Sequence, residues 1–425
     1  MHTIGYRITA AAVVTATAAA VLAVRTPPPR AVALSPVTAE TPASAPAGGP
    51  ADLAIQFEAL LGQHSVLAAD MMRSRIRGDD DFVQAANASL GQNTSDMTAL
   101  VGRLFGKPTA KQFQPMWSEH IVALFAYAGA LAGHDDAGRA DAREELIEYE
   151  GDLGAFFAGR SHGRLSVDAA HSLVAMHIQH LTGQADSYAA GNYARSDQLF
   201  REGFEHTYDL GLALATALLP PADAAVLARP VWRLRSQLGW LLSEHAVLIE
   251  DTTRAAVSRT PDFAASGRML NANTDDLAAA MDTLFGAPAA RRFQQLWGTH
   301  VTALVGYSAA DAAHDPARRQ RAREQLTTFE RSMSAFLADA TGGRSKPATL
   351  AAALSDHDQM LLQHADAYAS RDYSSAHEIA DQIYDHMFTL ARTLADAFGA
   401  SVAARLPKGG AQTGYGGLAG VVQKR

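Results

Sequence analysis

Apolar residues recur at intervals of three and four along most of the chain, a spacing typical of amphipathic helices. From about residue 52 onward the chain lacks the two-residue alternation of strands and the turn signals of hairpins. The breaks between the periodic stretches carry Gly, Pro and Asp, which end helices or form turns. The pattern therefore predicts an all-α protein, with helices over 52–77, 80–105, 109–133, 137–159, 166–190 and 192–219 in the first half of the chain.

The second half of the chain repeats this pattern at an offset of about 180 residues. The segment Trp117-Ser-Glu-His120 corresponds to Trp297-Gly-Thr-His300, and Asn93-Thr94 corresponds to Asn273-Thr274. A repeat of this length indicates two whole domains and not a solenoid of short units. The sequence thus predicts two homologous helical bundles in tandem, of about six helices each, over 51–220 and 222–398.

The two ends of the chain have a different composition from the bundles. Residues 8–24 are rich in Ala, Val, Leu and Thr and are flanked by Arg7 and Arg25, the layout of a signal peptide or of an uncleaved amino-terminal anchor. We therefore assign 1–25 to export, with 8–24 as a membrane tether if it is retained. Residues 26–50 form a Pro/Ala-rich linker, and the Gly-rich segment 399–425 predicts a disordered tail. Both alternatives for 1–25 place the bundles outside the cell or in the cell envelope.

The composition limits the chemistry that the bundles can perform. With 425 residues, of which 48% are hydrophobic, the chain can bury one large core or two ordinary ones, and the length favours two domains. The net charge of −8 and the lack of a basic stripe argue against nucleic-acid binding. The chain has no cysteine, which excludes disulfides, thiolate metal sites and cysteine nucleophiles. Any metal ion would have to be held mainly by nitrogen and oxygen ligands.

Each predicted helix carries one polar residue near its midpoint, on the apolar stripe. Antiparallel helices of similar length bring their midpoints to the same height, so these residues should form one inward-facing layer in each bundle. In the first bundle they are His64, Asn93, His120, Glu150, His177 and His206, and in the second they are His245, Asn273, His300, Glu330, His357 and His386.

Four imidazoles and a carboxylate in one layer indicate a transition-metal site in each bundle. Copper or zinc suits imidazole ligands, and iron becomes suitable if Glu150 and Glu330 take part. The amides of Asn93 and Asn273 are expected to hold an imidazole in position without binding the metal. Two alternatives stay open. The protein could be a metal-dependent enzyme with a His/Glu centre, or a cell-envelope structural or interaction protein whose buried layer only fixes helix register. A pocket leading to the layer would favour the enzyme, and a sealed layer with every polar group paired would favour the structural protein.

The duplicated pattern resembles a family of exported, all-helical bacterial proteins whose function is not established. The resemblance covers nearly all of 52–398 and is carried by Gln63-His64, Asn93-Thr94, 117–120, 186–188 and His206, with their partners in the second copy. Some members of the family are labelled copper amine oxidases. The tyrosine-derived cofactor of that class arises from an Asn-Tyr-Asp/Glu motif, whereas here Asn192-Tyr193 is followed by Ala194 and the matching position reads Asp372-Tyr373. The resemblance therefore implies a helical fold and export but no oxidase activity.

Overall fold

The computed structural model describes residues 49–405, and within them it contains thirteen helices and no strand. The all-α prediction is therefore confirmed for this part of the chain. The helices of the first half are α2 (Pro50–Arg77), α3 (Asp80–Phe105), α4 (Lys107–Gly133), α5 (Asp136–Arg160), α6 (Val167–Ala189) and α7 (Tyr193–Leu218). A short helix, α8 (Pro221–Leu227), precedes α9 (Pro230–Ser258), α10 (Phe263–Phe285), α11 (Ala287–Ala312), α12 (Pro316–Ala340), α13 (Pro347–Ala369) and α14 (Tyr373–Arg405).

Local sequence signals set several of these helix boundaries. The side chain of Asp135 accepts a hydrogen bond from the backbone N–H of Gly138 and caps the start of α5, and Asp315 does the same for α12 through Arg318. Gly78 ends α2 in the left-handed conformation, with φ of 74°, which glycine adopts at no steric cost. The short polar breaks therefore reverse the chain between long antiparallel helices.

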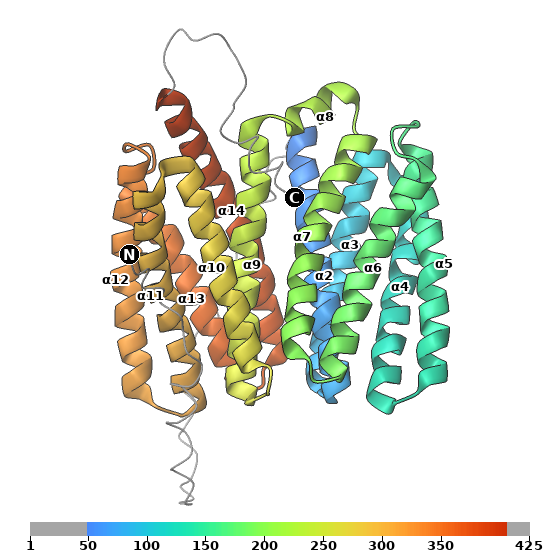
Figure 1. Cartoon of the computed structure of the whole chain (residues 1–425), viewed down its shortest axis with the longest axis horizontal. Helices are drawn as coiled ribbons and strands as arrows, with labels where there is room; N and C mark the ends of the chain where they lie inside the picture. Colours follow the sequence, from blue (N-terminus) through green and yellow to red (C-terminus); the bar gives the residue numbers. More distant parts are fainter. Residues whose placement is uncertain (1–48, 406–425) are drawn as a thin grey trace, which may run out of the picture.

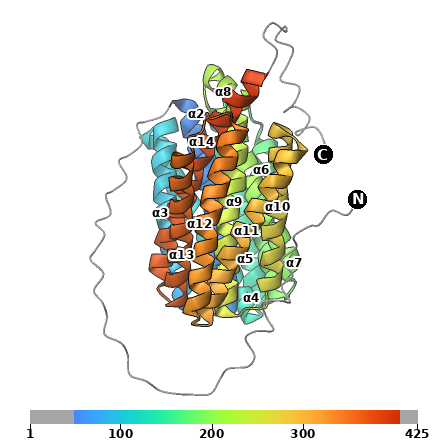
Figure 2. The same cartoon turned by 90° about the vertical axis from the view of Figure 1, so that its left-hand side faces the viewer.

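The axes of the long helices lie roughly along one direction, with successive helices antiparallel (Figures 1 and 2), and the helices form two sets of neighbours (Figure 1). We call α2–α7 the N-terminal half and α9–α14 the C-terminal half. In the N-terminal half α2 packs against α3, α4, α6 and α7, and in the C-terminal half α9 packs against α10, α11, α13 and α14. Figure 1 shows α4 and α5 at one end of the molecule and α11 and α12 at the other. Helices α2 and α9 thus occupy corresponding places in the two halves.

The two halves share a continuous apolar core, to which both contribute buried side chains. They meet where α2 contacts α9, α3 contacts α14, and α7 contacts α9 and α10. At Gly62 of α2 the approach is especially close, because a Cβ atom there would lie 2.6 Å from the Tyr384 hydroxyl and 2.7 Å from the Tyr208 ring. The Tyr208 hydroxyl also hydrogen-bonds the Tyr384 hydroxyl at 3.1 Å and the Ser243 hydroxyl at 2.9 Å. Only glycine fits at this junction of α2, α7 and α14.

A buried ionic network also joins the two halves. Arg73 of α2 pairs with Asp197 of α7 at 3.1 Å and lies 3.9 Å from Asp251 of α9. Arg254 of α9 pairs in turn with Asp251 at 2.8 Å and with Asp262. Buried pairs of this kind tolerate the loss of one partner poorly, because a charge would remain buried without compensation. The network therefore fixes the halves in one relative position.

The end of the last helix differs from the prediction. The sequence placed the end of the second bundle at 398 and a disordered tail from 399, whereas α14 continues to Arg405. This extension is anchored by Ser401, a buried residue whose hydroxyl donates to the Thr341 carbonyl at 3.0 Å. The sequence also did not predict α8 between the halves. The predicted signal or anchor at 1–25, most of the linker at 26–50 and the tail from 406 lie outside the described residues.

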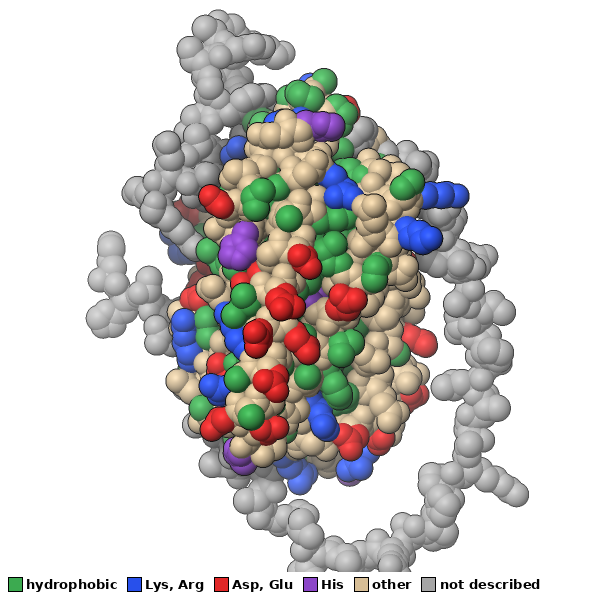
Figure 3. Space-filling model, turned by 90° about the vertical axis from the view of Figure 1, so that its right-hand side faces the viewer, with side chains coloured by type: hydrophobic (Ala, Val, Ile, Leu, Met, Phe, Trp, Pro, Cys, Tyr) green, Lys and Arg blue, Asp and Glu red, His purple; other side chains and the backbone are tan. Residues whose placement is uncertain are grey.

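The end of the molecule formed by α4 and α5 is drawn as a surface in Figure 3. Acidic side chains gather across the middle of this face, with apolar side chains dispersed between polar ones. The exposed large apolar residues include Val122 and Phe125 on α4 and Ile147 on α5. Dispersed apolar side chains are normal on protein surfaces and do not by themselves indicate a partner.

None of the helices in 49–405 is both long and apolar enough to cross a membrane.

Candidate metal centres

The structure gathers three histidines of each half into a buried triad. In the N-terminal half these are His64 of α2, His120 of α4 and His177 of α6, and in the C-terminal half they are His245 of α9, His300 of α11 and His357 of α13. Each residue offers one ring nitrogen, and the three nitrogens of a triad all lie within 4.8 Å of one another. Each triad could therefore hold a metal ion.

Two nitrogens of the first triad have the spacing that a shared metal ion requires. The Nε2 atoms of His64 and His120 lie 2.9 Å apart. Two nitrogens bound to one metal at about 2.0–2.1 Å stand about 2.9–3.4 Å apart for ligand angles between a right angle and a tetrahedral one. His177 completes the group, and among the described residues neither of its ring nitrogens has a hydrogen-bond partner. A buried imidazole without partners is costly, by about 1–3 kcal/mol for each unsatisfied group, unless a metal or water binds it.

The second triad repeats this geometry. The Nε2 atoms of His245 and His300 lie 3.2 Å apart, and both ring nitrogens of His357 lack a partner within the described part of the chain. Here, however, the Nδ1 atom of His300 lies 3.3 Å from Oδ1 of Asp358, a residue that follows His357 on α13. The second triad thus has a carboxyl group beside one of its imidazoles.

The surroundings keep all six imidazoles neutral at physiological pH. Burial lowers the pKa of His120 and of His245 to about 3. Burial also lowers the pKa of His64, His177 and His300 well below the usual range, and neighbouring imidazoles of the same triad lower it further. The pKa of His357 is lowered in the same way. Neutral imidazole is the form that binds metals. The triads are therefore ready to bind a metal ion without a prior deprotonation of imidazolium.

Aromatic side chains enclose the triads and limit access to them. The Trp117 ring lies 4.5 Å from the His64 ring, and the Tyr149 ring stacks on His120 at 4.3 Å between centroids. Trp297 and Phe329 occupy the corresponding places, with Phe329 stacked on His300 at 4.2 Å. The six imidazoles are between 0% and 4% exposed, so both sites are closed to bulk solvent.

The fourth histidine of each predicted set is directed elsewhere. The Nε2 atom of His206 lies 2.9 Å from the Leu173 carbonyl oxygen, and that of His386 lies 2.9 Å from the Ala353 carbonyl oxygen. The centroids of the His386 and His357 rings are 6.4 Å apart. These two imidazoles hydrogen-bond α6 and α13 to the helices that follow them, so the structure does not bring them into the triads.

The two predicted glutamates also lie outside the triads. Glu150 is buried, and one of its carboxylate oxygens lies 3.9 Å from Nη1 of Arg143. Burial raises the pKa of Glu330, and a hydrogen bond with Asp358 opposes that shift. Glu330 therefore contacts Asp358, and Asp358 in turn contacts His300.

The two predicted asparagines contact neither set of imidazoles. Asn93 donates from Nδ2 to the Leu60 carbonyl at 3.0 Å and to Oε1 of Gln63 at 2.9 Å. Asn273 donates in the same way to the Leu241 carbonyl at 3.0 Å and to Oε2 of Glu244 at 2.7 Å. Gln63 and Glu244 directly precede His64 and His245. Each asparagine thus holds the helix that carries the first histidine, and its effect on the imidazole is indirect.

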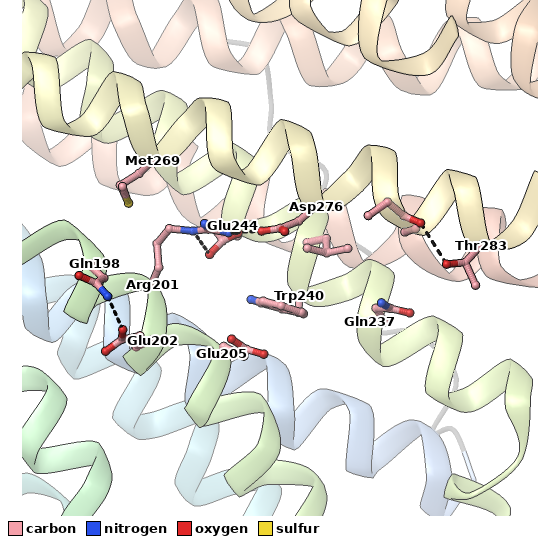
Figure 4. Close-up of a pocket in the computed structure, with 13 residues that line it drawn as sticks. Gln198, Arg201, Glu202, Glu205, Gln237, Trp240, Glu244, Met269, Asp276 and Thr283 are labelled. Carbon is pink, nitrogen blue, oxygen red and sulfur yellow. Dashed lines mark hydrogen bonds and ion pairs between the residues drawn. The ribbon is translucent and has the colours of Figure 1, made fainter. Parts of the chain in front are cut away.

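The contact at Glu244 opens onto a groove between the halves (Figure 4). Arg201 of α7 makes a two-pronged ion pair with Glu244, at 2.9 and 2.8 Å, and also reaches Asp276 of α10 at 2.8 Å. Trp240 of α9 lines the same groove, whose volume is about 490 Å³. Sequence reasoning did not identify this groove, because its residues come from three separate helices and form no local motif.

Asp358 is the second feature that sequence reasoning did not identify. It is not shared by the two copies, because the position matching Asp358 is Ile178. An acidic residue directly after a candidate ligand histidine was the available signal.

The comparisons with known proteins add no relative. No protein-family model, no curated protein and no solved structure matches this chain.

Proposed function

We propose that this chain is an exported metal-binding protein made of two homologous helical bundles, with one transition-metal ion held by the histidine triad of each bundle. The observation that carries the proposal is the orientation of His177 and His357. Each is a buried imidazole with no hydrogen-bond partner among the described residues, and each faces a pair of imidazoles whose Nε2 atoms have ligand spacing. A layer that served only to fix helix register would be expected to pair its own polar groups.

The donor set favours copper or zinc over iron. Three neutral imidazole nitrogens suit copper and zinc, whereas iron centres of the carboxylate–histidine type need an oxygen ligand. Neither Glu150 nor Glu330 belongs to a triad. Copper and zinc also suit an exported, cysteine-free protein, in which a metal ion has no thiolate to bind.

Burial of the triads favours a binding role over turnover of a substrate. A catalytic metal keeps a position open for water or substrate. Here the imidazoles are enclosed by Trp117, Tyr149, Trp297 and Phe329 and are at most 4% exposed. We therefore place metal sequestration or structural stabilisation ahead of the enzymatic alternative.

Metal analysis of the full chain, produced without a histidine tag, tests this proposal. We expect about two equivalents of copper or zinc in the unaltered protein, one in His120→Leu and one in His300→Leu, and none in the double variant. His134→Ala is the control, since His134 ends α4 in an exposed turn. Circular dichroism verifies that each variant is folded. A folded double variant that keeps its metal, or an unaltered protein that takes up none, would refute the proposal.

A further inference from the structure

One difference between the two triads is an acidic residue that contacts a histidine of the second. Asp358 follows the third histidine of the second triad, is 2% exposed and places Oδ1 3.3 Å from Nδ1 of His300. The matching residue in the first half is Ile178, which is fully buried in the apolar core. The Nδ1 atoms of His120 and His300 both lack a hydrogen bond among the described residues, and the difference between them is the carboxyl group that lies 3.3 Å from Nδ1 of His300.

The group stacked on the second histidine differs as well. Tyr149 stacks on His120, whereas Phe329 stacks on His300. Tyr149 is a neutral phenol whose buried hydroxyl has no partner in the described part of the chain. Among the described residues, the second triad has a carboxyl group within 4 Å of an imidazole nitrogen, and the first triad has no such pair.

A carboxylate beside Nδ1 strengthens a histidine ligand in two ways. It attracts the proton to Nδ1 and so leaves the lone pair on Nε2, the atom that faces His245. Burial raises the pKa of Asp358, and a cation bound at the triad favours the ionised form of this carboxyl group. Its negative charge then offsets the cation in a site with little water, where an uncompensated charge is costly. Outer carboxylates of this kind typically contribute a factor of about 10–100 in metal affinity.

We infer that the two sites are not equivalent: Asp358 makes the second triad the stronger site for a divalent cation, so that the first equivalent of metal occupies His245, His300 and His357. This inference rests on the proposed metal binding. Asp358 acts as a positioning residue, through His300, and is not itself a ligand. The first triad, which has no such carboxyl group beside an imidazole nitrogen among the described residues, fills after the second.

Titration with Zn²⁺ against a competing chelator tests the inference on full-length chains. His120→Leu leaves the second triad alone, and His300→Leu leaves the first. We expect the second triad to bind Zn²⁺ about 10–100-fold more tightly than the first. Adding Asp358→Asn, which keeps the shape and removes the charge, to His120→Leu should weaken binding by a similar factor. The same change in His300→Leu should leave the affinity of the first triad unaltered, which separates a local effect from general loss of structure.

Nitrogen-15 NMR of the imidazoles gives a second measurement, which would not change if Asp358 had a purely structural role. We expect the zinc-loaded protein to show His300 protonated at Nδ1, with an Nδ1 chemical shift that changes in Asp358→Asn. Equal affinities of the two isolated triads, or an unchanged affinity in Asp358→Asn, would overturn the inference while leaving the proposed function intact. No Zn²⁺ binding at either triad would overturn both.

Discussion

His64 and His120 are separated by 56 residues in the chain, yet their Nε2 atoms lie 2.9 Å apart at the centre of a helical bundle. Helices α2 and α4 bring them together, and α6 adds His177. The same relationship joins His245 and His300, at 3.2 Å. This convergence of neutral, buried imidazoles is the arrangement on which the proposed metal sites rest.

The first prediction distinguishes the third histidine from the fourth. His177→Leu should abolish metal binding by the first triad, because it removes a nitrogen that faces His64 and His120. His206→Gln should retain that metal, since His206 is bonded to the Leu173 carbonyl oxygen, and should cost only about 1 kcal/mol of stability for one hydrogen bond. Metal content and urea unfolding measure the two effects. Equal loss of metal in both variants would place His206 among the ligands.

The second prediction concerns the ion pair in the groove between the halves. Glu244 is buried, with a side chain 1% exposed, and Arg201 is its cationic partner. Arg201→Met should therefore destabilise the protein by about 3 kcal/mol. It leaves the buried carboxylate of Glu244 without its cation, with the hydrogen bond from Asn273 as the contact that remains among the described residues. The double variant Arg201→Met/Glu244→Gln should recover most of that loss. Chemical denaturation of the metal-free protein measures both changes.

Arg195 provides a matched control for this experiment on the same helix. Its ion pair with Glu202, at 3.7 Å, is about half exposed on both sides, so Arg195→Met should change stability by less than about 1 kcal/mol. Equal effects of the two arginine substitutions would show that burial of Glu244 does not govern the interaction.

The third prediction concerns pH and Glu58. Burial raises the pKa of this glutamate from its ordinary value of 4.5 to about 8, although Ser236 donates a hydrogen bond to it at 2.6 Å. Between these two pH values the folded state holds a proton that the unfolded state has released. Stability therefore falls as pH rises through this window, by about 1.4 kcal/mol per pH unit from this group.

Glu58→Gln should remove that contribution, because a carboxamide keeps an acceptor for Ser236 and does not ionise. Urea unfolding at pH 5.5, 6.5 and 7.5 should show that the variant gains stability relative to the unaltered protein at each step. A constant difference between the two proteins across this range would mean that the pKa of Glu58 is not raised.

The fourth prediction concerns removal of the metal. A ligand that binds only the folded state stabilises it by about 2.7 kcal/mol per site when its free concentration is a hundred times its dissociation constant. Chelation should therefore lower the thermal midpoint of the unaltered protein, and returning copper or zinc should restore it. The variant His120→Leu/His300→Leu should show no such response. A metal-dependent midpoint in that double variant would locate the binding outside the triads.

The sequence identified the helices more reliably than the ligands, and the reason is geometric. A three-to-four periodicity shows which face of a helix is buried, but that face spans 100° or more of the helix surface. His177 and His206 both lie on such a face, and only the packing of α6 and α7 determines that the first imidazole points at the pair and the second at a backbone carbonyl. Periodicity alone could not separate them.

Asp358 was missed for a different reason. Comparison of the two copies draws attention to residues that they share, whereas Asp358 is paired with Ile178. Its contact with His300 depends on the angle between α11 and α13, which the sequence does not specify. The difference between the sites therefore became visible only in the structure.

A crystal of the full chain grown with Zn²⁺, with anomalous diffraction measured at the zinc edge, tests the central claim most directly. We predict two anomalous peaks per chain. One should lie about 2.0–2.1 Å from nitrogens of His64, His120 and His177, and the other at the same distance from nitrogens of His245, His300 and His357. Peaks confined to other positions, with both triads empty at saturating zinc, would contradict the claim.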